Sequence, residues 1–435
     1  MSTSHRHVHL VAIVGRTGHH GASWRHPSAP VESVMDIEYQ IAEAKKAEKA
    51  LLDALFVAEF YSSRTSALDT FSQLSAIAAE TTHIGLINTI PTVYNEPYHI
   101  ARLIASLDHL SRGRAGWNFV TGADSAAHNF NRGRHPSHSE RYEEGDEAVE
   151  IIKRLWDSWE DGAILPDKKT GRYVDESRIH EINFVGKHYS VKGPLNLARP
   201  PQGHPVVLQS GSSDTGKEMA AKHGEAVYTA HQSLESAQKF YADLKSRLAK
   251  YGRTPDQLLI LPGLAPLIGE TEAEAKELER ELNSYIDTKK ALDALSQRFE
   301  VNLNNYDLDD PVPIDRAISE DKIDGIRSRH EAVLNPARRA PLTIRQLLYR
   351  TNAGRGHAAI TGTPLQVADF IEEWFRNDGA DGFNLIPQLE PQTSDLFFEK
   401  VIPELQNRGL FRTQYEGRTL RDHFGLKRPA GIVRN

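Results

Sequence analysis

Short apolar runs with strand character recur eight times along this chain, and segments with helical periodicity lie between most of them. A buried strand followed by an amphipathic helix is the unit from which parallel sheets are built. Continuously apolar strands also predict a sheet whose two faces are both covered. The strands are expected at residues 8–14, 54–60, 84–90, 115–120, 205–209, 226–230, within 258–268 and at 381–386. Helices are expected at residues 34–51, 67–80, 98–110 and 140–159. A single long helix is expected from residue 271 through the 290s.

Eight strands with helices between them favour a (β/α)8 TIM barrel, an α/β fold, as one domain over residues 1–435. A doubly wound open sheet is the alternative, although no Gly-x-Gly-x-x-Gly motif follows a strand to support it. Residues 161–204 and 300–357 lack clear periodicity, so we expect insertions there that could act as lids where a substrate enters. Residues 405–435 are expected to form a C-terminal extension.

Composition argues against several classes of function. The chain has no cysteine, which removes disulfides, thiolate catalysis and cysteine-bound zinc or iron–sulfur clusters. A net charge of −7 offers no basic field to nucleic acid, and no apolar run approaches the ~18 residues of a membrane span. The polar N-terminal segment is unlike a signal peptide, so a cytoplasmic location is expected.

Three histidines alternate in this N-terminal segment, namely His5, His7 and His9. They permit a metal site, but a segment that leads into a strand is favoured, and no metal is expected.

Small or polar residues follow several of the expected strands, and barrel enzymes place their chemistry at these carboxyl ends. The segment from Ser111 to Gly122 shows the pattern best, because a helix stop at Gly113 leads into an apolar strand that carries Asn118. Trp117, on the same strand, is expected to pack in the core. Glu59, Thr89 and Ser210 occupy comparable positions after other strands.

Two further features permit a phosphate site. Ser210-Gly-Ser-Ser213 joins a strand to a helix that begins near Asp214, where free N–H groups and the positive helix end attract anions. From these residues alone, a plain helix cap by Ser213 is favoured over phosphate binding. His138 and Tyr142 lie four residues apart at the start of a helix and share one face. They could hold a phosphate or the edge of a flavin ring, or they could form a surface pair without a ligand.

A loop rich in histidine follows the first strand, from His19 to Pro27. It could present a histidine to a substrate, or it could be a structural loop held by the Trp24 ring and a buried histidine, and the two interpretations carry equal weight. Nucleophilic serine catalysis is not indicated, because no Gly-x-Ser-x-Gly elbow occurs.

A set of motifs, each weak alone, is specific in combination. The chain resembles, nearly end to end, the nitrilotriacetate monooxygenase / dibenzothiophene-sulfone monooxygenase family of the bacterial luciferase-like superfamily. The motifs are Gly18-His-His-Gly-Ala-Ser-Trp-Arg-His-Pro27, Glu96-Pro-Tyr98 through Asn118-Phe-Val-Thr121, Arg141-Tyr142 through Leu155-Trp-Asp-Ser-Trp159, Gly193-Pro-Leu-Asn196, Gln209 through Gly216, Asp381-Gly-Phe-Asn384 and Pro403 through Arg412.

The resemblance implies a barrel that uses reduced FMN (FMNH₂) and O₂, with a separate NAD(P)H:flavin reductase as the FMNH₂ donor and a homodimeric or homotetrameric assembly. Oxygen would add to the flavin as a C4a-(hydro)peroxide that oxygenates a small organic substrate. His20, and His357 in Gly354-Arg-Gly-His357, are candidates to stabilise this adduct or steer protons, since imidazole titrates near neutral pH. The resemblance also favours a phosphate at Ser213. The flavin contacts carried over are Glu59, Thr89, Asn118, His138, Tyr142, Ser210 and Ser213.

Some positions depart from the family pattern. Glu59 stands where aspartate is usual, residues 61–69 look shorter with Asp69-Thr70 in place of Glu-Pro, and Pro91 replaces a serine. The first two of these changes are expected around the pocket and fit a different substrate or an altered activity. Two alternatives are therefore kept: a flavin- or deazaflavin-dependent hydride-transfer oxidoreductase, and a non-catalytic flavin-binding protein.

Overall fold

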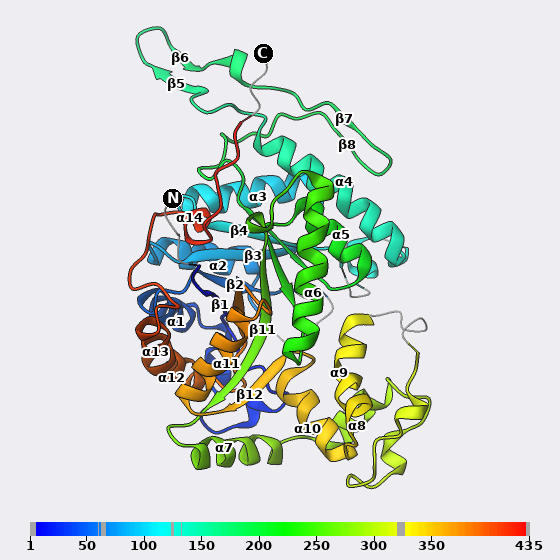
Figure 1. Cartoon of the computed structure of the whole chain (residues 1–435). Helices are drawn as coiled ribbons and strands as arrows, with labels where there is room; N and C mark the ends of the chain where they lie inside the picture. Colours follow the sequence, from blue (N-terminus) through cyan, green and yellow to red (C-terminus); the bar gives the residue numbers. More distant parts are fainter. Residues whose placement is uncertain are drawn as a thin grey trace.

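Eight parallel strands close into a barrel in the computed structural model, which describes residues 6–59, 61, 67–122, 126–131, 133–319 and 327–431 (Figure 1). In order around the barrel they are β1 (His9–Ile13), β2 (Ala54–Val57), β3 (Gly85–Pro91), β4 (Ala115–Val120), β9 (Val206–Ser210), β10 (Ala226–Thr229), β11 (Leu259–Ile268) and β13 (Gly382–Leu385). β13 pairs with β1 and closes the ring. All eight predicted strands are confirmed, and β2, β3 and β11 are buried at every position, as their unbroken apolar sequence requires.

Helices surround this barrel and run back from the carboxyl end of one strand to the amino end of the next. Within the described ranges, no helix has the length and apolar character that crossing a membrane would need. The helices that follow the barrel strands most directly are α1 (Ile37–Lys49), α2 (Thr70–Glu80), α3 (Pro97–Leu110), α4 (His138–Trp156), α5 (Asp214–His223), α6 (Leu234–Arg247) and α7 (Glu272–Ser284).

A ninth strand, β12 (Ala358–Gly362), joins the sheet and was not predicted. β11 is ten residues long, and its first four residues pair with β10 while its last five pair with β12. β12 therefore lengthens the wall on the carboxyl side of the barrel. Its residues do not alternate regularly between buried and exposed positions, so no period of two marks the strand in the sequence.

The long helix predicted from residue 271 is wrong, because the chain forms α7 and then a separate α8 (Thr288–Ser296). The carboxylate of Asp287 accepts a hydrogen bond from the Lys290 N–H and caps the start of α8. A charged sequence with an almost continuous helical pattern conceals this interruption.

Residues 300–357, expected to be irregular, contain two further helices, α9 (Arg327–Arg339) and α10 (Ile344–Gly354). α10 begins at a capping box formed by Thr343 and Gln346. Apolar residues of α8, α9 and α10 share a small core of their own, among them Leu292, Leu295, Val333, Leu334, Leu347 and Leu348. This segment follows β11, so it lies on the carboxyl side of the barrel, where a lid would have to be.

Residues 161–204 form two antiparallel hairpins, β5 (Ile164–Asp167) with β6 (Arg172–Val174), and β7 (Phe184–Val185) with β8 (Ser190–Val191). They lie between α4 and β9 and therefore emerge at the amino end of the strands. Figure 1 shows them at the opposite end of the molecule from α7 and α8. The expectation that this segment forms a lid over the substrate is thus wrong, because it is on the far side of the barrel from the strand ends that carry the site.

The C-terminal extension packs against the amino end of the barrel through α14 (Leu420–His423). Leu420 and Phe424 join a buried cluster with the barrel residues Val11, Ala54, Ile87 and Leu208. A Cβ at Gly85 would lie only 2.5 Å from Leu420 Cδ1, so the glycine on β3 leaves room for this leucine. The extension is therefore part of the core.

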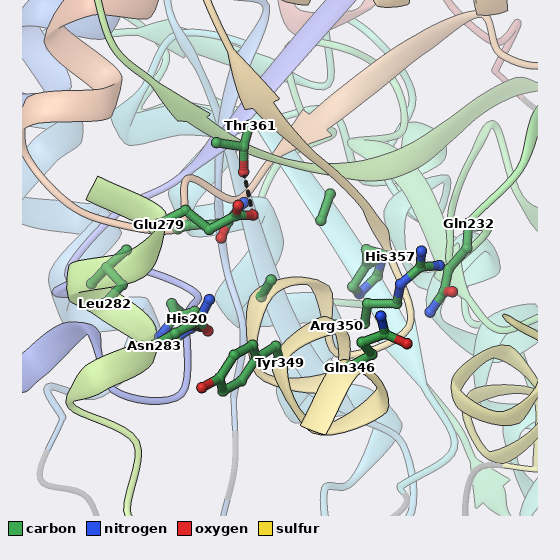
Figure 2. Close-up of a pocket in the computed structure, with 13 residues that line it drawn as sticks. His20, Gln232, Glu279, Leu282, Asn283, Gln346, Tyr349, Arg350, His357 and Thr361 are labelled. Carbon is green, nitrogen blue, oxygen red and sulfur yellow. Dashed lines mark hydrogen bonds between the residues drawn. The ribbon is translucent and has the colours of Figure 1, made fainter. Parts of the chain in front are cut away.

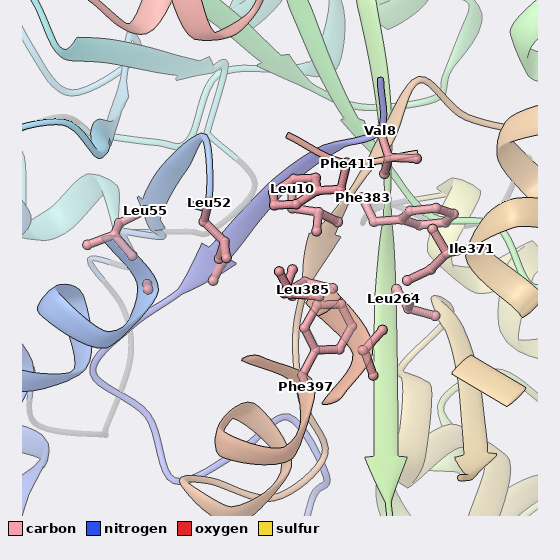
Figure 3. Packing of buried hydrophobic residues seen from close by; sticks show 14 of the residues in the cluster. Val8, Leu10, Leu52, Leu55, Leu264, Ile371, Phe383, Leu385, Phe397 and Phe411 are labelled. Atoms are coloured by element: carbon pink, nitrogen blue, oxygen red, sulfur yellow. The ribbon is translucent and has the colours of Figure 1, made fainter. Parts of the chain in front are cut away.

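A larger core lies outside the barrel wall, between the strands and the helices that cover them (Figure 3). Leu10 and Phe383, on the neighbouring strands β1 and β13, pack there with Ile371 of α11 (Pro364–Arg376) and with Phe397. Each such side chain contributes about 1.5–3 kcal/mol when fully buried. This layer fixes the orientation of the strands whose ends carry the site.

Glu390 is a buried acid just after β13. Its Oε1 accepts a 2.8 Å hydrogen bond from Ser394, whereas its Oε2 has no hydrogen-bond partner within the part of the chain that the structure describes. Burial, with the nearby carboxylates of Glu43 and Asp395, raises the pKa of Glu390 to about 8. The carboxyl group is therefore protonated in the folded protein at neutral pH.

Glu390→Gln is expected to remove a pH dependence of stability. The folded pKa of about 8 lies above the unfolded value, so the wild type binds the extra proton when folded and loses this stability as pH rises from about 5 towards 8. The loss attributable to Glu390 is roughly 3 kcal/mol over this window. Urea unfolding of both proteins at pH 5 and pH 8 measures it. The exposed Glu399→Gln serves as the control, and an identical pH profile for wild type and E390Q would contradict the assignment.

Candidate active site

Three predicted cofactor residues form one row of hydrogen bonds at the mouth of the barrel. Asn118 of β4 donates from Nδ2 to Thr89 Oγ1 on β3 over 3.0 Å, and Ser210 of β9 donates from Oγ to Asn118 Oδ1 over 2.9 Å. Thr89 and Asn118 are paired in the strand register and both are buried. The row crosses three neighbouring strands at their carboxyl ends, where the chemistry of such barrels is placed.

Glu59 extends the polar mouth on the β2 side. The Thr70 hydroxyl lies 2.8 Å from Asn88 Oδ1 and 3.3 Å from Glu59 Oε2, so it connects the end of β2 to β3. Asp69 caps α2 by accepting a hydrogen bond from the Ser72 N–H. Most of the shortened segment 61–69 lies outside the described residues, and a flavin contact by Glu59 stays a prediction.

Ser213, Tyr142 and His138 come together at the start of α5. Ser213 is the N-cap, with its Oγ accepting from the Gly216 N–H over 3.1 Å, so the expected helix cap is present. The Tyr142 hydroxyl lies 3.4 Å from Ser213 Oγ, and the ring of the exposed His138 contacts the Tyr142 ring at 4.6 Å between centroids. The first N–H groups of α5 have no partner within the helix and could donate to a bound anion.

An unsatisfied polar atom beside the start of α5 fits a polar ligand such as a flavin. Gln209 Oε1 is buried and has no hydrogen-bond partner among the described residues. A buried amide group without a partner costs about 1–3 kcal/mol, which a polar ligand can recover. A Cβ at Gly211 would stand 3.0 Å from Gln209 Nε2 and 3.8 Å from the Tyr142 hydroxyl, so the glycine keeps the space between them open. A ring with polar edges and a phosphate matches this set of groups.

The two predicted catalytic histidines line a separate cavity of about 560 Å³ beside the mouth (Figure 2). The other predicted site residues do not line it. Its wall is made of His20, Gln232, Glu279, Leu282, Asn283, Gln346, Tyr349, Arg350, Ala353, His357, Ala359, Thr361 and Gln388.

His20 is held as a neutral imidazole. Its Nδ1 accepts a hydrogen bond from the Ala22 N–H over 3.1 Å, so Nε2 carries the proton and faces Asn283 Oδ1 at 3.3 Å. Burial lowers the pKa of His20 to about 4. The expectation that this imidazole titrates near neutral pH is therefore wrong, because desolvation disfavours the charged ring. At neutral pH His20 can donate a hydrogen bond but cannot act as a cationic acid.

Tyr228 links the cavity to the mouth. It is the register partner of Ser210, and its hydroxyl lies 3.3 Å from His357 Nε2, with the two rings stacked at an interplanar angle of 16°. A Cβ at Gly263 would stand 2.4 Å from His357 Nδ1, so glycine is needed there for the imidazole to fit. The sequence showed Tyr228 only as one aromatic residue in a short strand, without a sign of its partner.

Trp24 does not hold the loop that follows β1. Its side chain is 59% exposed, whereas His20 is buried by contacts with α7. In the structural interpretation of this loop, the buried histidine is confirmed and the tryptophan anchor is wrong. His20 also lines the cavity, and a contact between this histidine and a substrate stays a prediction. Trp117 of β4 is fully buried, as expected of a core residue.

Across the described parts of the chain, no three His, Asp or Glu side chains are grouped to hold a metal ion.

A parallel barrel with a polar mouth and an adjoining cavity at its carboxyl end defines the class of TIM-barrel enzymes. Residues 17–382 match the model of the luciferase-like monooxygenase family. The chain therefore belongs to this family.

Individual relatives agree with this assignment over the full length. The chain is 44% identical to nitrilotriacetate monooxygenase component A of Aminobacter aminovorans and 43% identical to N-acetyl-S-(2-succino)cysteine monooxygenase of Bacillus subtilis, with 99% of each chain covered in both cases. The structure matches that of the riboflavin lyase RcaE, determined with a modified FMN, at 27% identity and a TM-score of 0.83 over 98% of this chain and 97% of that one. The predicted barrel and monooxygenase family are confirmed.

Proposed function

We propose that this protein is the oxygenase component of a two-component system, which uses reduced FMN and O₂ to oxygenate a small organic molecule. The observation that carries the proposal is the polar row from Thr89 through Asn118 to Ser210, which leads to the helix start at Ser213. FMN has a ring with polar edges at one end and a phosphate at the other, and the mouth offers matching groups for both.

The residues of the mouth would divide the binding of FMN between them. Ser213, Tyr142, His138 and the first N–H groups of α5 would hold the phosphate, because a helix start concentrates donors and positive potential. Thr89, Asn118 and Ser210, with Glu59 at the β2 side, would orient the ring. When bound, reduced FMN supplies the electrons with which one atom of O₂ is transferred to a substrate.

His20 and His357 would act in the adjoining cavity. His20, neutral at pH 7, would exchange its Nε2 hydrogen bond to Asn283 Oδ1 for one to an oxygen atom of the reacting groups. His357 is positioned by Tyr228, the register partner of Ser210, and would lie between flavin and substrate.

A flavin reductase would be the partner of this chain. The relative from Aminobacter aminovorans is named component A, which indicates a second component. We expect the pair to act in the cytoplasm and this chain to form a homodimer or homotetramer.

Oxygen-transfer assays test the proposed function. The purified chain, a generic NADH:FMN reductase and a panel of organic acids and thioethers are incubated under ¹⁸O₂, and products are analysed by mass spectrometry. A product that gains one ¹⁸O atom, only when the chain is present, supports the proposal. Hydrogen peroxide as the sole oxygen product with every compound would contradict it and favour a non-catalytic flavin protein, and substrate oxidation under anaerobic conditions with deazaflavin would favour hydride transfer.

A further inference from the structure

An asparagine of β13 points into the barrel just below its mouth. Phe383 and Leu385, on either side of it in the strand, pack into the core outside the wall, so Asn384 between them faces inwards (Figure 3). Asn384 is only 2% exposed. Its register partners are Val11 on β1 and Gly263 on β11, and neither has a polar side chain. The neighbouring strands therefore offer this amide no side-chain partner at its own position.

Four inward side chains make up one layer across the barrel at this height. Such a layer takes its members from alternate strands, and the strand registers give Phe56 of β2, Asn118 of β4, Tyr228 of β10 and Asn384 of β13. The rings of Phe56 and Tyr228 meet across the middle, with 5.5 Å between their centroids, although β2 and β10 lie on opposite sides of the barrel. β4 and β13 are opposite in the same way. The layer is therefore a floor with an aromatic centre and an amide on each side.

The two amides of this floor differ in their hydrogen bonds. Asn118 uses both ends of its amide, because it donates to Thr89 and accepts from Ser210. Asn384 makes no side-chain hydrogen bond within the described ranges, and its Oδ1 is buried. A buried amide without a partner is unfavourable, and a leucine of similar size would avoid this cost. An amide kept here at the expense of stability fits a contact with a ligand.

The next layer towards the mouth leaves room above this floor. Its members are Ile13, Thr89, Ser210 and Gly263. Ser210 is small, Gly263 has no side chain, and both Ile13 and Ser210 are partly exposed. A Cβ at Gly263 would stand 2.4 Å from His357 Nδ1, so the imidazole occupies the space beside Asn384, the register partner of this glycine. A flat ligand on the floor would have Asn384 and His357 at the same edge.

From this arrangement we infer that Asn384 binds the polar edge of the flavin ring and thereby orients the ring in the mouth. That edge carries the N3–H group between two carbonyl groups. An amide presents a donor and an acceptor side by side, so it pairs with the N–H and one of these carbonyls. Since His357 packs beside Asn384, this orientation turns the polar half of the ring towards the cavity that His20 and His357 line. The inference rests on the proposed function, because it takes FMN to be the cofactor.

The binding of FMN and of 3-methyl-FMN to the full-length protein tests this contact. In 3-methyl-FMN a methyl group replaces the hydrogen on N3, so the donor of the polar edge is lost while the phosphate is unchanged. Fluorescence titration gives both dissociation constants for the wild type, Asn384→Leu and Phe56→Leu. Phe56→Leu is the matched control, because it alters packing in the same layer without removing a hydrogen-bonding group. Urea unfolding of the flavin-free proteins is measured in parallel.

The wild type is expected to bind FMN about 10-fold more tightly than 3-methyl-FMN, because the loss of a hydrogen bond to a buried amide weakens binding by roughly this factor. Asn384→Leu should bind FMN about 10-fold more weakly than the wild type and should bind the two flavins within about threefold of each other. It should also be at least as stable to urea as the wild type, since an amide without a partner is gone. Phe56→Leu should keep the wild-type preference for FMN.

The inference is overturned if Asn384→Leu keeps the wild-type preference for FMN or binds FMN as tightly as the wild type does. Should the leucine variant not fold, Asn384→Ala gives the same comparison of the two flavins. Transfer of ¹⁸O to a substrate, combined with an unchanged preference in the variant, would overturn this inference alone and leave the proposed function standing. Absence of FMN binding by the wild type would overturn both.

Discussion

Ser213→Asp is expected to weaken the binding of reduced FMN about 1000-fold while leaving the fold intact. Aspartate caps helices as well as serine does, so α5 keeps the hydrogen bond to the Gly216 N–H. Its carboxylate would stand where the proposed phosphate binds, and two like charges ~4 Å apart near a protein surface repel by about 4 kcal/mol. That energy corresponds to roughly three powers of ten in affinity.

Anaerobic fluorescence titration measures this affinity, and riboflavin provides the internal control. Riboflavin lacks the phosphate, so its weaker binding should be the same in wild type and Ser213→Asp. Thr271→Asp is the matched protein control, since Thr271 caps α7 in the same way and is exposed. Should Ser213→Asp bind FMN within threefold of wild type, the phosphate does not lie at this helix start.

Arg421→Met is expected to lower the free energy of unfolding by about 3 kcal/mol, because it leaves the largely buried carboxylate of Glu225 without its counter-charge. Arg421 is almost fully buried and donates to both oxygens of Glu225, over 2.7 and 2.8 Å. It also donates to the His204 carbonyl over 2.8 Å. Burial by itself would raise the pKa of Glu225, but Arg421 holds that pKa below its usual value.

Urea unfolding followed by circular dichroism tests the role of this pair. Arg418→Met is the control, since Arg418 is exposed in the same extension and should change stability by no more than ~0.5 kcal/mol. The double variant Arg421→Met/Glu225→Gln should recover part of the loss, because the buried charge is then gone. A loss below 1 kcal/mol in Arg421→Met would show that the extension does not hold the barrel together.

Much of the fold could be predicted because the signals are local. An apolar run of strand length has few alternatives to burial in a sheet, so all eight barrel strands were located from the sequence. β12 escaped because its burial does not alternate, and the break between α7 and α8 escaped because Asp287 interrupts a nearly continuous helical pattern. The amino-end position of residues 161–204 follows from connectivity between α4 and β9, and reading that segment by itself could not show it.

The candidate site was predictable in part for the same reason. Thr89, Asn118 and Ser210 stand at strand ends, and neighbouring parallel strands bring such ends together, so their row of hydrogen bonds follows from the barrel. Ser213 caps a helix through residues three positions away. In each case the sequence needed only the local element and the order of the strands.

By itself, then, the sequence determined a barrel and the polar residues that rim its mouth, because periodicity and capping act over a few residues. Tertiary structure alone decided the cavity. Asn283, 263 residues along the chain, meets the buried imidazole of His20, and Tyr228 meets His357 across 129 residues. Arg350 and Glu279 face one space because two helices pack on the same side of the barrel. Distances of this kind, and the desolvation that lowers the pKa of His20, arise only when the barrel closes and its helices pack.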